Sequence, residues 1–224
     1  MNVPSQLPLP LAASQGVSRS DLIVAPANAR AIAFIETWPS WPVVAAAIHG
    51  PAGSGKSHLV AIWRELSNAR IVGAADLSSL ATQEFAGRPL AIEDVDSVAA
   101  SEARDRTLFA AIEAATLVAP LLLTSKEHPS TWACSLPDLA SRFSALVSFP
   151  VWAPDEGLLT ALARKLFDDR QLAVPEAVIA HMLRSLERSP GAIRDFVALA
   201  DSRALAQGRA VNVALVRELL AERG

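Results

Sequence analysis

The sequence contains an eight-residue loop motif, Gly50-Pro51-Ala52-Gly53-Ser54-Gly55-Lys56-Ser57, which has the form G-x-x-x-x-G-K-[ST]. Residues 43–48 in front of it are apolar and partly β-branched, as in a buried parallel strand, and residues 57–63 behind it have the apolar spacing of a helix. A phosphate-binding loop requires this strand, loop and helix context. The motif therefore predicts a site for a nucleoside diphosphate or triphosphate.

The residue types of the motif suit this chemistry. Glycines let backbone N–H groups turn inward onto the phosphates, Lys56 reaches the β and γ oxygens, and the Ser57 hydroxyl ligates Mg²⁺ at the start of the helix. We take all eight residues of the loop as nucleotide-binding candidates, together with His58, which follows directly. The alternative is an ordinary glycine-rich turn between a strand and a helix, and the flanking pattern disfavours it.

Composition restricts the class of protein. The chain has 224 residues, of which 51% are hydrophobic, and a formal net charge of -3. This charge argues against a protein that mainly wraps nucleic acid, because such a surface needs a basic excess. The single cysteine, Cys134, excludes an internal disulfide framework, and the four histidines have no metal-ligand spacing. No apolar run approaches the roughly 18 residues of a membrane span, so we expect a cytoplasmic protein without membrane contact.

The order of the predicted elements indicates the fold class. Apolar strand candidates alternate with helical patterns, which favours a parallel sheet covered by helices on both faces. The strands are expected at residues 70–73, 90–92, 121–124 and 146–149, and the helices at residues 28–38, 101–117 and 136–143. We therefore expect an α/β nucleotide-binding domain over residues 21–152, preceded by a flexible tail of residues 1–20.

The strand pattern stops after residues 150–154. Amphipathic helices are predicted from there to the C-terminus, with Asp155 as the first N-cap, over residues 155–170, 175–187, 190–207 and 213–222. The sequence therefore predicts a small, all-helical domain over residues 153–224.

Polar residues follow two of the predicted strands. Glu93 and Asp94 come directly after the apolar run 90–92. Phosphate-loop ATPases keep a Mg²⁺ ligand and a water-orienting acid at this point, and we assign these roles to Glu93 and Asp94 respectively. The alternative is a solvated acidic turn. Ser125 ends the next strand, where a small hydroxyl suits contact with a γ-phosphate or with the attacking water.

This order of parts resembles the AAA+ ATPase core of the bacterial initiator DnaA over about residues 20–222. Residues 21–24 with Asn28 resemble the DnaA segment that wraps the adenine, which implies that Val24 and Asn28 contact the base. Residues 120–125 are similar to the sensor-one strand of DnaA. The resemblance implies an AAA+ nucleotide domain followed by a helical lid.

Two arginines also gain roles from this resemblance. Residues 138–143 are similar to the DnaA segment that carries the arginine finger, which implies that role for Arg142. Residues 189–195 are similar to the start of the DnaA lid helix, which implies Arg194 as the sensor-two residue. Without these contexts, either arginine reads as a helix-end or surface residue.

The N-terminal tail carries a second motif. Residues 6–11, Gln-Leu-Pro-Leu-Pro-Leu, resemble the hexapeptide with which bacterial proteins dock on the replication sliding clamp. Prolines limit the freedom of the unbound peptide, and this lowers the cost of laying leucines into an apolar groove. The resemblance implies partner contacts by Gln6, Leu7, Leu9, Pro10 and Leu11. The alternative is a Pro-Leu tail without a role.

A clamp motif joined to a DnaA-like core, in a sequence that stops before a DnaA-type DNA-binding domain, resembles the Hda family of regulatory inactivators of DnaA. This resemblance implies a negative regulator of chromosome replication initiation that binds ADP or ATP with Mg²⁺. Such a protein would sit on the DNA-loaded clamp, touch DNA indirectly through the clamp, and present Arg142 in trans to ATP bound by DnaA. It would act as an activator of the partner's ATPase more than as a fast ATPase, and self-association into a homo-oligomer is compatible with it.

The sequence departs from the DnaA pattern at two positions. Glu93 stands where DnaA has the first of two aspartates, and Asp138 stands where DnaA has a second arginine. An alternative function is an ATP-dependent helicase or transposition loader of the DnaC/IstB type, which would use ATP itself and touch single strands. The clamp-like hexapeptide and the low basic charge disfavour that alternative. A third interpretation is a nucleotide-binding scaffold whose lid mediates only protein contacts.

Overall fold

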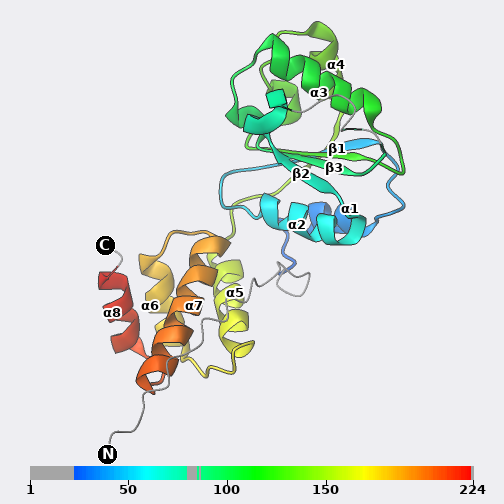
Figure 1. The fold of residues 1–224 in the computed structure, drawn as a ribbon. Helices are drawn as coiled ribbons and strands as arrows, with labels where there is room; N and C mark the ends of the chain where they lie inside the picture. The colour runs from blue at the N-terminus through cyan, green and yellow to red at the C-terminus, as the bar shows by residue number, and fades with distance from the viewer. Residues whose placement is uncertain (1–22, 80–84, 86, 223–224) are drawn as a thin grey trace, which may run out of the picture. The chain divides into compact units, whose positions relative to one another are not determined.

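A computed structural model of the chain describes residues 23–79, 85 and 87–222 (Figure 1). The chain divides into two compact units after Pro154, whereas the sequence placed the boundary after Trp152. The first is an α/β unit that begins at Val24, and the second is a helical unit that begins at Asp155 and includes Ile23. Within the described ranges, no helix is long and apolar enough to cross a membrane.

The α/β unit contains a five-stranded parallel sheet of order β2-β3-β4-β1-β5. This confirms the predicted fold class. The central strands are buried on both faces, which explains why they read as continuous apolar runs in the sequence. The strands are β1 (Ala45–His49), β2 (Arg70–Gly73), β3 (Leu90–Glu93), β4 (Leu121–Ser125) and β5 (Val147–Pro150).

Helices cover the two faces of this sheet (Figure 1). One face carries α1 (Ala29–Glu36) and α2 (Lys56–Ser67), and the other carries α3 (Glu102–Ala114) and α4 (Pro137–Ala145). The predicted helix 101–117 ends early, at Ala114, because Thr116 and Ala119 form a reciprocally hydrogen-bonded turn. Short 3₁₀ turns complete the unit: η2 (Ala74–Ser79), η4 (Val95–Ser97) and η5 (Pro129–Thr131).

The two faces of the sheet are packed by different side chains. On the α3 and α4 side, alternate strand residues pack with Leu108, Leu139 and Phe143 in one apolar core. On the other side, three aromatic rings stack in a row. The ring centroid of Trp41 lies 4.8 Å from that of Trp63 and 4.2 Å from that of Phe34. Each face of the sheet is therefore covered by its own apolar layer.

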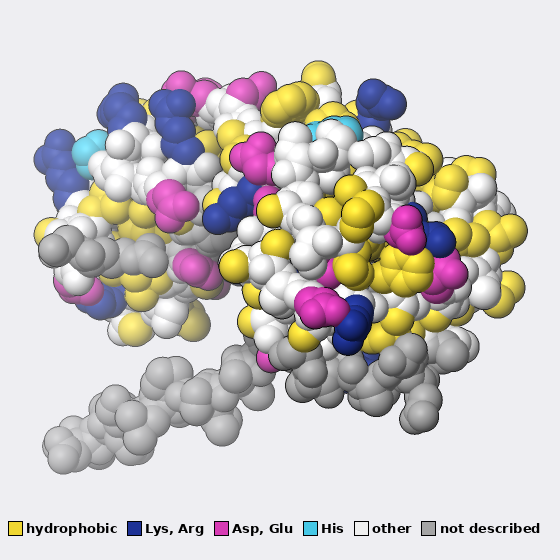
Figure 2. Space-filling view, turned by 90° about the horizontal axis from the view of Figure 1, so that it is seen from above, with side chains coloured by type: hydrophobic (Ala, Val, Ile, Leu, Met, Phe, Trp, Pro, Cys, Tyr) yellow, Lys and Arg dark blue, Asp and Glu magenta, His cyan; other side chains and the backbone are white. Residues whose placement is uncertain are grey.

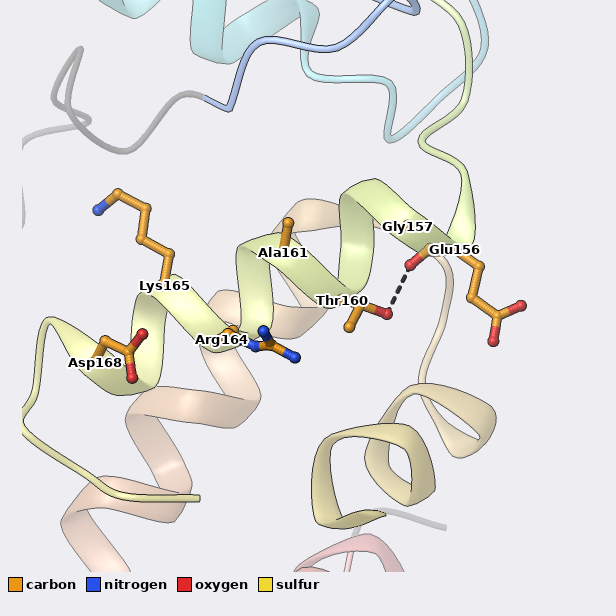
Figure 3. Close-up of a pocket in the computed structure, with 7 residues that line it drawn as sticks. All are labelled: Glu156, Gly157, Thr160, Ala161, Arg164, Lys165 and Asp168. Carbon is orange, nitrogen blue, oxygen red and sulfur yellow. Dashed lines mark hydrogen bonds between the residues drawn. The ribbon is translucent and has the colours of Figure 1, made fainter. Parts of the chain in front are cut away.

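The helical unit consists of α5 (Glu156–Asp168), α6 (Glu176–Ser185), α7 (Pro190–Gln207) and α8 (Val213–Ala221). Asp155 caps α5 as predicted, since its side chain accepts a hydrogen bond from Leu158 N at 2.7 Å. The four helices enclose a core that includes Phe167, Met182 and Phe196, with Ile23 packed against it. A shallow pocket on α5 is lined by Glu156, Gly157, Thr160, Ala161, Arg164, Lys165 and Asp168 (Figure 3).

The surface carries charges of both signs. In the view of Figure 2, acidic and basic side chains alternate with hydrophobic ones, and neither sign of charge covers a large area. This distribution agrees with the small net charge of -3.

Gly50 lies where the carboxyl ends of three strands meet. Its N–H donates to Ser125 O at the end of β4 at 3.1 Å, and the N–H of Val151, just beyond β5, donates to His49 O at 2.8 Å. A Cβ atom on Gly50 would lie 1.8 Å from Val151 O, and the φ angle of Gly50 is +153°. The backbones therefore approach so closely that no side chain fits at this position.

Replacement of Gly50 by Ala should lower the free energy of unfolding by more than about 1 kcal/mol, because a backbone carbonyl must move and the φ angle is strained. Gly191→Ala is the matched control, since a Cβ there has no neighbour within 4 Å. Urea denaturation of both variants measures the difference. Equal stability of Gly50→Ala and the wild type would contradict the close approach.

Candidate nucleotide-binding site

The loop of residues 50–57 connects β1 to α2, as the motif predicts. Gly50, Gly53 and Gly55 all have positive φ angles, at +153°, +73° and +100°, which glycine adopts without a steric cost. Pro51, Ala52 and Gly53 are exposed at the tip of the loop. The loop is thus a short, open turn at the carboxyl edge of the sheet, immediately before the first turn of a helix.

Lys56 is folded back into this loop. Its side chain is buried, and Nζ donates to Gly50 O at 2.7 Å and to Pro51 O at 3.0 Å. Burial lowers the pKa of Lys56, and the negative charges of Asp94 and Asp96 partly oppose that shift. A buried cation is favoured by an anion placed next to it. The loop therefore offers a desolvated ammonium group suited to a phosphate.

Two buried oxygen atoms of this edge have no hydrogen-bond partner within the described part of the chain. They are Ser54 Oγ, inside the loop, and Glu93 Oε1, at the end of β3. Unpaired buried polar atoms cost free energy, which points to a missing ligand or water. Ser57 is exposed on the first turn of α2, whereas His58 is buried on the same helix. His58 therefore lies among the buried residues of α2.

The acidic end of β3 is tied to the end of β4. Asp94 is exposed and has a left-handed backbone, and its N–H donates to Thr124 Oγ1 at 3.0 Å. The Asp96 carboxylate accepts hydrogen bonds from Lys126 N and Glu127 N, each at 2.9 Å. Asp96 was not among the predicted site residues, although a carboxylate just after a strand end is a common partner for free N–H groups.

The hydroxyl of Ser125 does not point to an open phosphate position. Ser125 is fully buried, and its Oγ donates to Glu127 O at 2.7 Å. The expected phosphate contact by Ser125 is therefore at odds with its local hydrogen bonding, because a hydroxyl has one proton to donate. The hydroxyl that lies beside Asp94 is that of the neighbouring residue, Thr124, which accepts the hydrogen bond from Asp94 N.

The residues expected to contact the base lie on the turn before α1. Val24 is 54% exposed, whereas Asn28 is buried and its Oδ1 accepts a hydrogen bond from Ala25 N at 2.9 Å. Asn28 therefore stabilises the turn itself. The turn is also bound to the segment after β5, since Trp152 N donates to Ala27 O at 3.0 Å.

Arg142 lies at the opposite end of the strands from the loop. It is in the last turn of α4 and lines a groove with Val44, Ala45 and Val147, at the amino ends of β1 and β5. The loop of residues 50–57 follows the opposite end of β1, and five residues of strand span about 13 Å between the first and last Cα. Arg142 therefore does not belong to the nucleotide site of its own chain.

The guanidinium of Arg142 is held by α3. It pairs with Glu113 Oε1 at 2.6 Å, and its Cζ lies 4.6 Å from the ring centroid of Phe109. Asp138 is exposed in the first turn of the same helix, α4. Both contacts leave the arginine partly open to solvent, with 38% of its side chain exposed.

The remaining site predictions lie elsewhere. Arg194 is half-buried in α7 of the helical unit. Within the part of the chain that the structure describes, no group of three His, Cys, Asp or Glu side chains is placed to hold a metal ion by itself. The expected clamp contacts lie outside the described residues: Gln6, Leu7, Leu9, Pro10 and Leu11.

The fold is similar to that of solved AAA+ proteins, although no protein-family model and no curated protein matches the sequence. Domain III of DnaA from Thermotoga maritima superposes with a TM-score of 0.75 at 17% identity, over 92% of this chain and 96% of that one. AMPPCP-bound DnaA from Aquifex aeolicus gives 0.68 at 18% identity, over 80% of this chain and 63% of that one.

A DNA motor shares the fold as well. The Thermotoga maritima RuvB Holliday junction branch migration motor gives a TM-score of 0.61 at 14% identity, over 84% of this chain and 66% of that one. The chain thus spans about two thirds of the longer DnaA and RuvB chains, and nearly all of the isolated DnaA domain. The five-stranded sheet, the phosphate loop and the helical region after it together give this chain the AAA+ fold found in DnaA and RuvB.

Proposed function

We propose that this chain binds ADP or ATP at residues 50–57 and acts as an AAA+ regulator of replication initiation, which stimulates hydrolysis of ATP bound to DnaA. Nucleotide binding is supported by the loop geometry, by the buried Lys56 and by the unpaired oxygens of Ser54 and Glu93. The Aquifex aeolicus DnaA structure with the same fold is bound to AMPPCP.

Mg²⁺ fits the residues at this edge. Ser57 offers an exposed hydroxyl at the start of α2, and Glu93 has a buried carboxylate oxygen without a partner in the described chain. Mg²⁺ usually takes one or two protein ligands together with phosphate oxygens and waters, so a larger protein cluster is not needed. When bound, the ion would neutralise phosphate charge. Lys56 would hold the phosphates, and Asp94 would orient water.

The observation that carries the regulatory proposal is the position of Arg142. An arginine that completed its own chain's site would lie near the carboxyl ends of the strands, but Arg142 lies in the groove at their amino ends. Its guanidinium can therefore meet a triphosphate only on another molecule. An arginine finger supplied in trans stabilises charge on the transferred phosphoryl group.

The surface near Arg142 suits a protein partner. Four apolar side chains are exposed along the amino edge of the sheet: Val44 (39%), Leu117 (54%), Val118 (81%) and Val147 (42%). The segment that holds Leu117 and Val118 leads into β4, whose Leu121 N donates to Val44 O at 2.9 Å. Exposed apolar side chains grouped on one edge are typical of interaction sites.

Clamp binding by residues 6–11 is the second part of the proposal. It rests on the sequence of the tail, and it explains how such a regulator would be confined to active replication forks.

The decisive experiment measures hydrolysis of DnaA-bound ATP with and without this protein and DNA-loaded clamp. Rapid ATP hydrolysis by this chain alone, unaffected by DnaA, would instead support the loader function.

Lys56→Ala should weaken ADP and ATP binding by about 10- to 100-fold, because it removes a charged hydrogen-bond donor to the phosphates. Since a ligand stabilises the folded state that binds it, the rise in melting temperature on adding ADP should shrink as well. Isothermal titration calorimetry and thermal denaturation measure both effects. Arg106→Ala, which removes an exposed cation of α3 that pairs with Glu102, is the control. Unchanged affinity in Lys56→Ala would exclude the site.

Arg142→Ala and Arg142→Lys should each reduce stimulation of DnaA-bound ATP hydrolysis by about 10³- to 10⁵-fold, up to the loss of all stimulation. Lysine fails because a point charge cannot replace the planar guanidinium fork. Nucleotide and clamp affinity should remain at wild-type values. Arg106→Ala, an exposed arginine of α3 that pairs with Glu102, should retain stimulation. Full stimulation by both Arg142 variants would place the finger elsewhere.

Substitution of Leu9 and Leu11 by Ala, or deletion of residues 1–12, should abolish binding to the sliding clamp. The apolar anchors are lost, while folding and ADP affinity should persist because the described residues that form the two apolar cores remain in place. Surface plasmon resonance with immobilised clamp measures the effect. Val17→Ala, in the same tail, should bind like the wild type. Clamp binding by the truncated chain would refute the assignment.

A further inference from the structure

Trp152 differs from the other four tryptophans of the chain. Trp41, Trp63 and Trp132 are at most 6% exposed and Trp38 is half-buried, and each of them contacts another aromatic ring. The Trp152 side chain is 61% exposed and stacks on no aromatic ring of the described residues. An indole is a large, mostly apolar group, so a solvent-exposed one is a common sign of a binding surface.

The backbone fixes Trp152 next to the phosphate loop. Val151 N donates to His49 O at 2.8 Å, and Val151 O lies where a Cβ of Gly50 would be, at 1.8 Å. Consecutive Cα atoms are about 3.8 Å apart, so Trp152 begins one residue away from direct contact with the first glycine of the loop. The buried Val151 side chain anchors this segment.

A second backbone contact fixes Trp152 against the turn before α1. Trp152 N donates to Ala27 O at 3.0 Å. That turn is closed by hydrogen bonds from Asn28 N to Ala25 O at 3.0 Å and from Ala25 N to Asn28 Oδ1 at 2.9 Å. It begins beside Val24, which is 54% exposed. Two exposed apolar side chains are therefore attached to one hydrogen-bonded backbone bridge beside the loop.

We propose that the indole of Trp152 stacks on the base of the nucleotide whose phosphates are held by residues 50–57. The inference rests on the nucleotide binding proposed above and names the residue that recognises the base. A nucleotide with its β-phosphate in the loop carries its base within one nucleoside of that loop, which is the neighbourhood of Trp152. Stacking uses the π face that every base has, so adenine and guanine nucleotides should depend on Trp152 alike.

The test compares ligands with and without a base. Trp152→Leu keeps an apolar side chain but removes the aromatic face, and Trp152→Phe keeps an aromatic face. Trp152→Leu should weaken ADP and GDP binding by about 5- to 150-fold and leave binding of inorganic pyrophosphate unchanged. Trp152→Phe should retain most of the ADP affinity. Val118→Ala, an exposed apolar residue at the other edge of the sheet, is the control and should bind all three ligands normally.

Each other outcome has a distinct meaning. Wild-type ADP affinity in Trp152→Leu overturns the stacking role and leaves the proposed nucleotide site intact. An equal loss of ADP and pyrophosphate affinity also overturns it, because Trp152 would then support the loop and not the base. If the wild-type chain binds neither ADP nor pyrophosphate, the proposed function fails together with this inference.

Discussion

The close approach of Gly50 to Val151 is the constraint on which the candidate site depends. Because Gly50 has no side chain, the carbonyl of Val151 can lie where a Cβ would be, and the ends of β1, β4 and β5 converge at one point. The phosphate loop leaves the sheet from that point. The segment after β5 is held against the loop, and this brings Trp152 and the turn before α1 to the same edge. The absence of a side chain at Gly50 thus allows these chain segments to lie close together.

Charge at this edge is arranged around Lys56. Burial lowers the pKa of its ammonium group, and the carboxylates that follow β3 act in the opposite direction. Lys56 therefore loses its proton at a lower pH than a solvated lysine would. The ammonium meanwhile donates to two carbonyl groups of its own loop. A phosphate is a stronger acceptor than a carbonyl group, so the loop offers a cation that a ligand can recruit without a large rearrangement.

The fold was largely predictable because its signals are local. The apolar runs predicted the strands of the sheet, the loop motif predicted the turn between β1 and α2, and Asp155 indicated the start of α5. The contacts that decide the site were not predictable, since they join residues far apart in the sequence. Asp94 bonds to Thr124, and Ser125 uses its hydroxyl on Glu127 instead of turning it outward. The sequence pattern also predicted a helix as far as residue 117, because no local signal indicated the turn that follows Ala114.

The pairing of Arg142 with Glu113 is consistent with an arginine that acts on another molecule. Both side chains are substantially exposed, at 38% and 51%, and an ion pair of this kind contributes about 0–1 kcal/mol. The contact with Phe109 adds about 0.5–1 kcal/mol at an exposed site. These contacts are strong enough to favour one orientation of the guanidinium and weak enough to be exchanged. A triphosphate carries several negative charges where Glu113 carries one, and in a desolvated interface its hydrogen bonds to the planar fork are stronger. In the proposed complex, the exchange from carboxylate to phosphate would therefore be favourable once a partner's nucleotide reached the groove, and α3 would hold the guanidinium in one orientation until then.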